Sequence, residues 1–143
     1  MPPTIDRFDG KYRFLSNFYP SPIVYEGQRY RSVEHGYQAA KSLDPAIRQK
    51  IAAQTTPGKA KSHGRHVALR PDWESVKISV MRDLLRLKFA IPELHDQLLA
   101  TSDAKLIEGN DWGDAMWGVY KGRGQNWLGR LLMKVRDELR GAR

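Results

Sequence analysis

The sequence contains no cysteine among its 143 residues. Disulfide bonds, thiolate zinc sites and cysteine nucleophiles are therefore excluded. It also lacks an apolar run long enough for a membrane span, and its first residues lack the apolar core of a signal peptide. No repeat, linker or low-complexity tract divides it, and its length is that of one ordinary domain. We therefore expect a single cytoplasmic domain over residues 1–143 that has no membrane partner.

Acidic residues are outnumbered by basic ones: 16 Asp and Glu stand against 24 Lys and Arg, which gives a formal net charge of +8. A positive field favours an anionic partner, and a nucleotide or a nucleic acid both qualify. The basic residues are scattered, although residues 59–70 are locally dense in them. Solubility is the alternative explanation, and charge alone does not separate the two.

Residues 11–31 read as short extended pieces. A turn at Glu26-Gly27 between residues 23–25 and 28–30 predicts a small β-hairpin. Helices predominate after it. Asp44-Pro45 and Thr56-Pro57 combine a capping residue with proline at the first helical position, which predicts helices over 45–54 and 58–64. Residues 64–70 are expected to form a connector or a short strand.

The longest predicted helix covers residues 71–90, because apolar residues from Trp73 to Leu87 recur at spacings of three and four. This periodicity makes Trp73 a core residue. A shorter helix is expected from Pro92, and a final one is expected after Asn126 as its N-cap. Residues 104–108 fit either helix or strand, and residues 109–125 form a glycine- and tryptophan-rich loop of the kind that often carries function. The fold class is therefore mainly α, with a small N-terminal β-hairpin.

The polar stretch at residues 32–41 is the first candidate site. Read as a helix with Ser32 as its N-cap, it places Glu34, Gln38 and Lys41 on one face. A carboxylate can stabilise positive charge at a glycosidic carbon or activate water. A lysine can hold phosphate, or attack a carbonyl carbon if its pKa is lowered, a shift that a nearby Glu34 opposes. An ordinary solvated Glu–Lys helix face is the alternative.

Other candidates lie outside this helix. Asn17, between aromatic residues, either caps a turn or faces a ligand. Asp114 and Asp111 compete for a second carboxylate role, with turn formation as the alternative for each. Trp112 and Trp117 could stack on a base, and the glycine loop at 122–126 is a weak anion site. His63 and His66 lack a third ligand, so no metal site is predicted.

Two stretches together resemble the NADAR or YbiA-like family: Leu15-Ser16-Asn17-Phe18, and Glu34-His35 followed by Gln38 and Lys41. Further motifs of that family follow in order to Leu139, including the segment at 72–77 and Asp114 with Trp117-Gly118. The resemblance implies a mostly helical single domain of YbiA-like fold. It also implies an N-glycosidase that needs no cofactor.

The resemblance also implies a substrate. One branch of the family removes ADP-ribose from guanine in nucleic acid, which we expect here, with a cognate ADP-ribosyltransferase toxin as partner. Another branch cleaves aminopyrimidine ribotides of the early riboflavin pathway. A non-catalytic module that binds ADP-ribose or nucleic acid is the third alternative. The segment Val119-Tyr120-Lys121 departs from the glycine-rich segment common in the family, and this bulk could change which base is admitted.

By the same resemblance, Glu34, Lys41 and Asp114 are the expected catalytic residues. Lys41 matches the helix lysine of the family and is our choice for a covalent Schiff-base route, with direct water attack as the alternative. The expected substrate-binding residues are Ser16, Asn17, Phe18, His35, Gln38, Arg65, Trp73, Trp117, Gly118 and Asn126.

Overall fold

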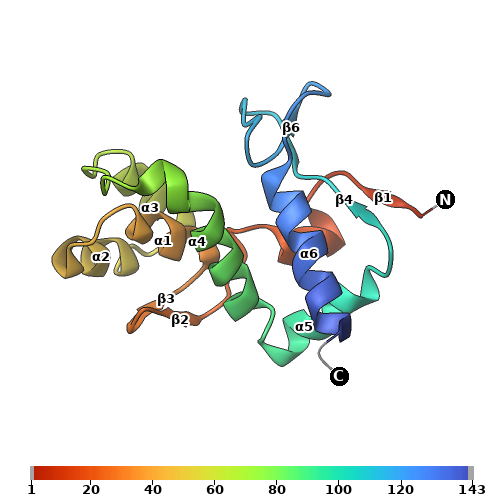
Figure 1. Cartoon of the computed structure of the whole chain (residues 1–143), viewed down its shortest axis with the longest axis horizontal. Coiled ribbons are helices and arrows are strands. Elements are labelled where there is room, and N and C mark those ends of the chain that lie inside the picture. The colour runs from red at the N-terminus through yellow and green to blue at the C-terminus, as the bar shows by residue number, and fades with distance from the viewer. Residues whose placement is uncertain (1, 142–143) are drawn as a thin grey trace. The chain divides into compact units, whose positions relative to one another are not determined.

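The computed structural model describes residues 2–141 and is mainly helical, with a few short strands (Figure 1). This confirms the fold class expected from the sequence. Backbone packing divides the chain into two compact units. The central unit is Asn17–Lys88, and the terminal unit joins residues 2–16 to residues 89–141. That residues 1–143 act as a single domain stays a prediction.

The central unit is built around α1 (Val33–Ala40), every residue of which is buried. The helix packs against α2 (Pro45–Ala52), α3 (Pro57–Gly64) and α4 (Trp73–Lys88) (Figure 1). Gly36 permits the close approach of α4, because a Cβ atom there would lie 2.8 Å from Cδ2 of Leu84. Asp44 and Thr56 cap α2 and α3 with their side chains, as predicted.

The predicted hairpin is confirmed. Strands β2 (Ile23–Tyr25) and β3 (Gln28–Tyr30) pair antiparallel. Glu26 and Gly27 join them with φ values of 49° and 82°, the left-handed conformation that two-residue hairpin loops require. Residues 65–72 contain neither helix nor strand, so the connector expected at 64–70 begins directly after α3.

The terminal unit contains α5 (Pro92–Ala100) and α6 (Trp127–Gly141), which pack together. The segment Gly10–Leu15 forms a 3₁₀ helix, so the expectation of extended structure from residue 11 was wrong there. Two parallel ladders join distant segments: β1 (Thr4–Ile5) with β4 (Lys105–Leu106), and β5 (Gly109–Asn110) with β6 (Val119–Tyr120). Strand β4 resolves the ambiguity at 104–108. The loop expected at 109–125 thus contains two short strands.

Within residues 2–141, no helix combines the length and the apolar composition that crossing a bilayer demands.

Candidate active site

One face of α1 brings together the carboxylate and the amide that the spacing predicted. Nε2 of Gln38 donates a hydrogen bond of 2.7 Å to Oε2 of Glu34. Both side chains are buried, with 8% of Glu34 and 4% of Gln38 exposed. Glu34 lies in the first turn of α1, where the helix dipole favours negative charge. Hydrogen bonding and the helix end together make a buried carboxylate tolerable here.

Lys41 is the C-cap of α1, directly after Ala40. Burial lowers the pKa of Lys41, the carboxylate of Glu34 raises it, and the charges of Arg65 and Lys61 lower it further. The net direction is downward, so burial and the two cations outweigh the opposition expected from Glu34. Nζ of Lys41 lies 6.0 Å from the centre of the Tyr37 ring. A lowered pKa increases the fraction of neutral amine, which is the form of lysine that nucleophilic attack requires.

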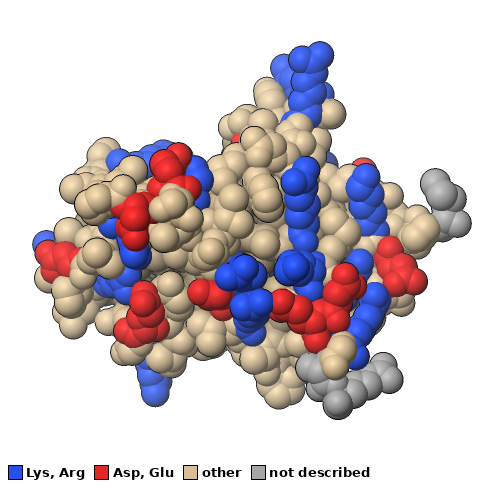
Figure 2. All heavy atoms as spheres, viewed as in Figure 1, with Lys and Arg blue, Asp and Glu red and all other residues tan. Residues whose placement is uncertain are grey.

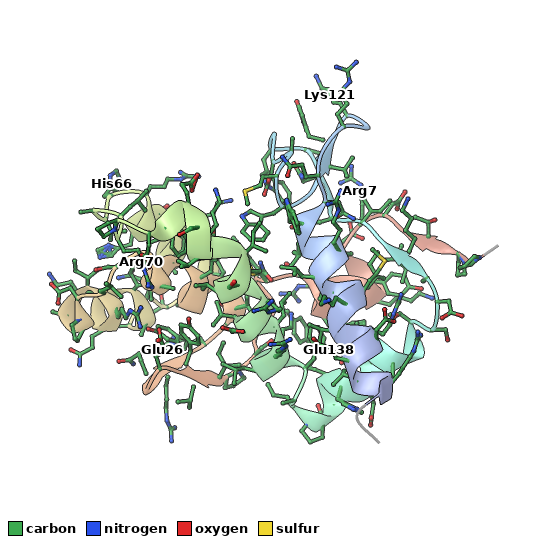
Figure 3. The ribbon with its side chains drawn as sticks, in the orientation of Figure 1. Arg7, Glu26, His66, Arg70, Lys121 and Glu138 are labelled. Carbon is green, nitrogen blue, oxygen red and sulfur yellow. The ribbon has the colours of Figure 1, made fainter. Side chains whose placement is uncertain are left out.

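Arg70, which is labelled in Figure 3, holds the C-terminal end of α1 by hydrogen bonds. Its backbone N–H donates to the carbonyl oxygen of Lys41 at 2.8 Å. Its guanidinium pairs with the carboxylate of Asp72 at 2.6 Å and reaches the carbonyl of Ala40 at 3.5 Å. A cation at a helix C-terminus is favourable, because the last carbonyls carry partial negative charge.

Asn17 lies against the other end of α1. Its carbonyl oxygen accepts the backbone N–H of Glu34 at 3.1 Å. Its amide nitrogen donates to the sulfur of Met81 at 3.5 Å, and its amide oxygen is buried with no hydrogen-bond partner within the described chain. A buried acceptor of this kind is well suited to a hydroxyl group of a ligand. The neighbouring Phe18 is 41% exposed.

His35 has a different environment from Glu34. Its side chain is completely buried, with Nδ1 2.7 Å from Oγ of Ser32 and Nε2 2.9 Å from the carbonyl oxygen of Gln54. Burial lowers its pKa, which favours the neutral ring. These contacts join the start of α1 to the segment just after α2. A direct substrate contact by His35 stays a prediction.

Arg65 and Trp73 surround the lysine end of α1 in different ways. Arg65 is an exposed residue that caps α3, and its charge acts on Lys41. Trp73 is only 4% exposed, and its ring centre lies 5.2 Å from that of Tyr37 at an interplanar angle of 55°. This tilted packing is that of a core aromatic residue, as the helical periodicity indicated.

Asp114 belongs to the terminal unit and shapes its own loop. Its Oδ1 accepts the backbone N–H groups of Met116 at 3.1 Å and Trp117 at 2.9 Å. The buried Asn110 holds it in turn, accepting its N–H at 3.0 Å and donating to its carbonyl at 2.8 Å. Asp111 was the alternative candidate for the second carboxylate role. Its side chain is 79% exposed and ion-paired with Arg7, which is labelled in Figure 3.

The other candidates of the terminal unit are tied to the backbone. A Cβ atom at Gly118 would overlap the carbonyl oxygen of Glu108, so only glycine fits there. The Asn126 side chain accepts the N–H of Glu108 at 3.0 Å and donates to the carbonyl of Leu106 at 2.9 Å. The backbone N–H of Ser16, the residue that follows the 3₁₀ helix, donates a hydrogen bond to the carbonyl oxygen of Arg13.

The predicted residues therefore fall into two sets, whose roles in binding and catalysis stay predictions. The central unit holds Asn17, Phe18, Glu34, His35, Gln38, Lys41, Arg65 and Trp73, and the terminal unit holds Ser16, Asp114, Trp117, Gly118 and Asn126. Among residues 2–141, no group of three or more His, Cys, Asp or Glu side chains is arranged to hold a metal ion.

Sequence reasoning missed Lys88, which is completely buried at the end of α4. Its Nζ lies 5.9 Å from the centre of the Tyr19 ring, and burial lowers its pKa to about 7. The signal was present, because Lys88 continues the buried stripe of Met81, Leu84 and Leu85 at helical spacing. Gly64 belongs to a motif, Gly64-Arg65, that contributed to the family resemblance, but no role was predicted for it.

Known proteins resemble this chain over nearly all of its length. The model of the NADAR domain family matches residues 6–140. N-glycosidase YbiA of Escherichia coli is 44% identical over 132 residues, which cover 90% of this chain and 82% of that protein. A riboflavin biosynthesis protein of Vibrio vulnificus is 40% identical over 136 residues, which cover 92% of this chain and 36% of that protein.

The fold is shared as well. The NMR structure of E. coli YbiA matches with a TM-score of 0.85 and 42% identity, over 98% of this chain and 87% of that chain. With a family match over nearly all its length and relatives of 40% identity or more, the chain belongs to the NADAR domain family and is a glycosidase hydrolase of that family.

Proposed function

We propose that the chain hydrolyses the bond between C1 of a phosphorylated ribose and an amino nitrogen on a pyrimidine-type ring. The observation that carries this proposal is the face of α1, where the buried Glu34 and a lysine of lowered pKa occur together. The N-glycosidase relatives support the class of bond. Asp114 stays a candidate for a further catalytic role.

The chemistry follows from these two groups. When the C1–N bond breaks, its electron pair leaves with the ring amino nitrogen, which takes up a proton. Positive charge then develops at C1, and the carboxylate of Glu34 stabilises it. In the covalent route the neutral amine of Lys41 adds to C1, the sugar ring opens to an imine, and water releases the sugar as an aldehyde. In the direct route water adds to C1 instead.

We place an aminopyrimidine ribotide first among the substrates. A relative 40% identical over 92% of this chain is a riboflavin biosynthesis protein, which supports this choice. The sequence had favoured ADP-ribosylated guanine in nucleic acid, which we keep as the second candidate because the net charge of +8 suits a polyanion. A cognate ADP-ribosyltransferase toxin belongs to that second candidate only. A cytoplasmic location stays a prediction.

The test incubates the protein with each substrate and identifies the product. Ribose 5-phosphate from the aminopyrimidine ribotide supports the first candidate, and ADP-ribose from ADP-ribosylated guanine DNA supports the second. Stabilisation by ADP-ribose without turnover of either substrate would contradict the enzymatic proposal and favour a binding module.

Substitutions at Lys41 test the mechanism. We expect Lys41→Met and Glu34→Gln each to lower kcat by about 100-fold or more, since each removes a group that acts in the transition state. Lys41→Arg keeps the charge but cannot form an imine, so it separates phosphate binding from covalent attack. Borohydride should trap the sugar on the wild type and not on Lys41→Met.

The exposed Lys134 on α6, outside the basic segment around Lys41, supplies the matched control, and Lys134→Met should keep full activity. Wild-type rates in Lys41→Met would exclude Lys41 from the reaction. Full activity of Lys41→Arg, with no trapped adduct, would leave only the direct route.

A further inference from the structure

Gly64 is the last residue of α3 and packs directly against Gln38 of α1. A Cβ atom at position 64 would overlap Oε1 of Gln38 and lie 2.8 Å from its Cδ and 2.9 Å from its Cβ. Side chains in real structures essentially never approach this closely. Every residue larger than glycine would therefore have to displace the Gln38 side chain or α3 itself.

The backbone of Gly64 does not explain why glycine stands there. Its φ is not among the positive values of the described chain, although it is the last residue of α3, where a left-handed glycine is common just beyond the helix. The lack of room for a Cβ atom beside Gln38 is therefore the physical reason for the glycine.

The Gln38 amide has two ends that the structure treats differently. Its nitrogen donates to Glu34 at 2.7 Å, whereas its oxygen is buried without a hydrogen-bond partner within the described residues. The amide is thus not held at its oxygen by a donor. The close packing of that oxygen against Gly64 leaves the nitrogen directed at the carboxylate.

We propose that Gly64 is a positioning residue, which acts through Gln38 to hold the carboxylate of Glu34 in the orientation that the reaction needs. The inference rests on the proposed role of Glu34 at C1. Two contacts connect α3 to the carboxylate on α1. Gly64 leaves room for the Gln38 amide, and that amide donates a hydrogen bond to one oxygen of Glu34. The other oxygen of Glu34 is then directed by the position of the first.

Gly58 provides a matched control in the same helix. A Cβ atom there would meet only Oγ1 of Thr56, at an ordinary distance of 4.0 Å. Gly58→Ala and Gly64→Ala add the same methyl group to α3, but only the second adds it against Gln38. Differences between the two variants therefore report on this contact rather than on helix propensity.

The experiment measures kcat and KM of both variants with the aminopyrimidine ribotide. We expect Gly64→Ala to lower kcat by about 10- to 100-fold with KM within about twofold, because a misplaced catalytic group costs rate more than binding. Gly58→Ala should match the wild type. In the Gln38→Ala background, Gly64→Ala should have little further effect, since the overlapping amide is gone.

A kcat of Gly64→Ala equal to that of Gly58→Ala would overturn the proposal, as would an equally large effect of Gly64→Ala with and without the Gln38 amide. Gln38→Met removes the donor while Gly64 stays intact, so it should reproduce the loss of kcat even if Gly64→Ala does not fold. Wild-type kcat in Gln38→Met would also overturn it.

A readout without substrate separates this inference from the proposed function. The side-chain NH₂ resonances of Gln38 in a ¹⁵N–¹H NMR spectrum should move on Gly64→Ala and on Glu34→Gln, and stay in place on Gly58→Ala. If these shifts occur and no ribosylated substrate is turned over, the positioning contact stands and the proposed reaction fails. Unmoved resonances in Gly64→Ala would reject the contact itself.

Discussion

At the scale of single residues, Lys88 makes a prediction about pH. Burial lowers its pKa from 10.5 to about 7, and an unfolded chain restores the ordinary value. Below pH 7 both states carry the proton, so the folded state bears the cost of burying the charged amine. Between about pH 7 and 10.5 the unfolded state binds more protons, and stability therefore rises with pH.

We expect the contribution of Lys88 to rise by roughly 5 kcal/mol over this range, because each pH unit between the two pKa values adds about 1.4 kcal/mol. Denaturant unfolding of the wild type and of Lys88→Met at several pH values measures it. The stability advantage of Lys88→Met should be largest near pH 6 and should shrink as the pH approaches 10. A difference that is constant with pH would contradict a buried lysine.

At the scale of elements, α1 depends on the cap at its N-terminus. Oγ of Ser32 accepts the N–H of His35 at 3.2 Å and lies 2.7 Å from its ring Nδ1. We expect Ser32→Ala to lower the free energy of unfolding by about 1–2 kcal/mol, since a cap and a buried partner are lost together. Ser32→Thr keeps the hydroxyl and should retain most of the stability. Equal stability of Ser32→Ala and wild type in urea would show that α1 forms without this cap.

At the scale of the whole molecule, the net charge of +8 is unevenly distributed along the chain. Residues 45–71, which contain α2 and α3, include six Lys and Arg and no Asp or Glu. Basic side chains elsewhere are interspersed with acidic ones, as the face in Figure 2 shows. Lys61 of α3 and Arg65, the cap of α3, both lower the pKa of Lys41 through their charges. This segment therefore adds to the positive field around the candidate site.

We therefore expect kcat/KM for a phosphorylated substrate to fall as NaCl rises from about 50 to about 500 mM, since salt screens this attraction. Lys59→Gln on α3 should weaken the salt dependence more than Lys134→Gln on α6, although both residues are exposed and each change removes one charge. Identical salt profiles for the two variants would mean that only the total charge matters. Initial rates at several salt concentrations supply the measurement.

The local features of this protein could be predicted from its residues alone. The hairpin turn at Glu26-Gly27, the caps at Asp44 and Thr56 and the shared face of Glu34 and Gln38 were all predicted and are confirmed. Each depends on residues within a few positions of one another, so helical and strand periodicity and capping chemistry suffice to predict it.

Features that depend on distant partners could not be predicted in this way, because they arise only in the packed chain. The parallel pairing of Thr4 with Lys105 has no local signal, because strand partners in such ladders are chosen across the chain. The pKa of Lys41 is lowered by burial and by the charge of Arg65, which caps α3. These effects outweigh that of Glu34, the neighbour that could be identified from the spacing along the chain. The fit of Gly64 against Gln38 likewise arises only where α3 and α1 meet, since a side chain's free volume and solvation are properties of the packed chain.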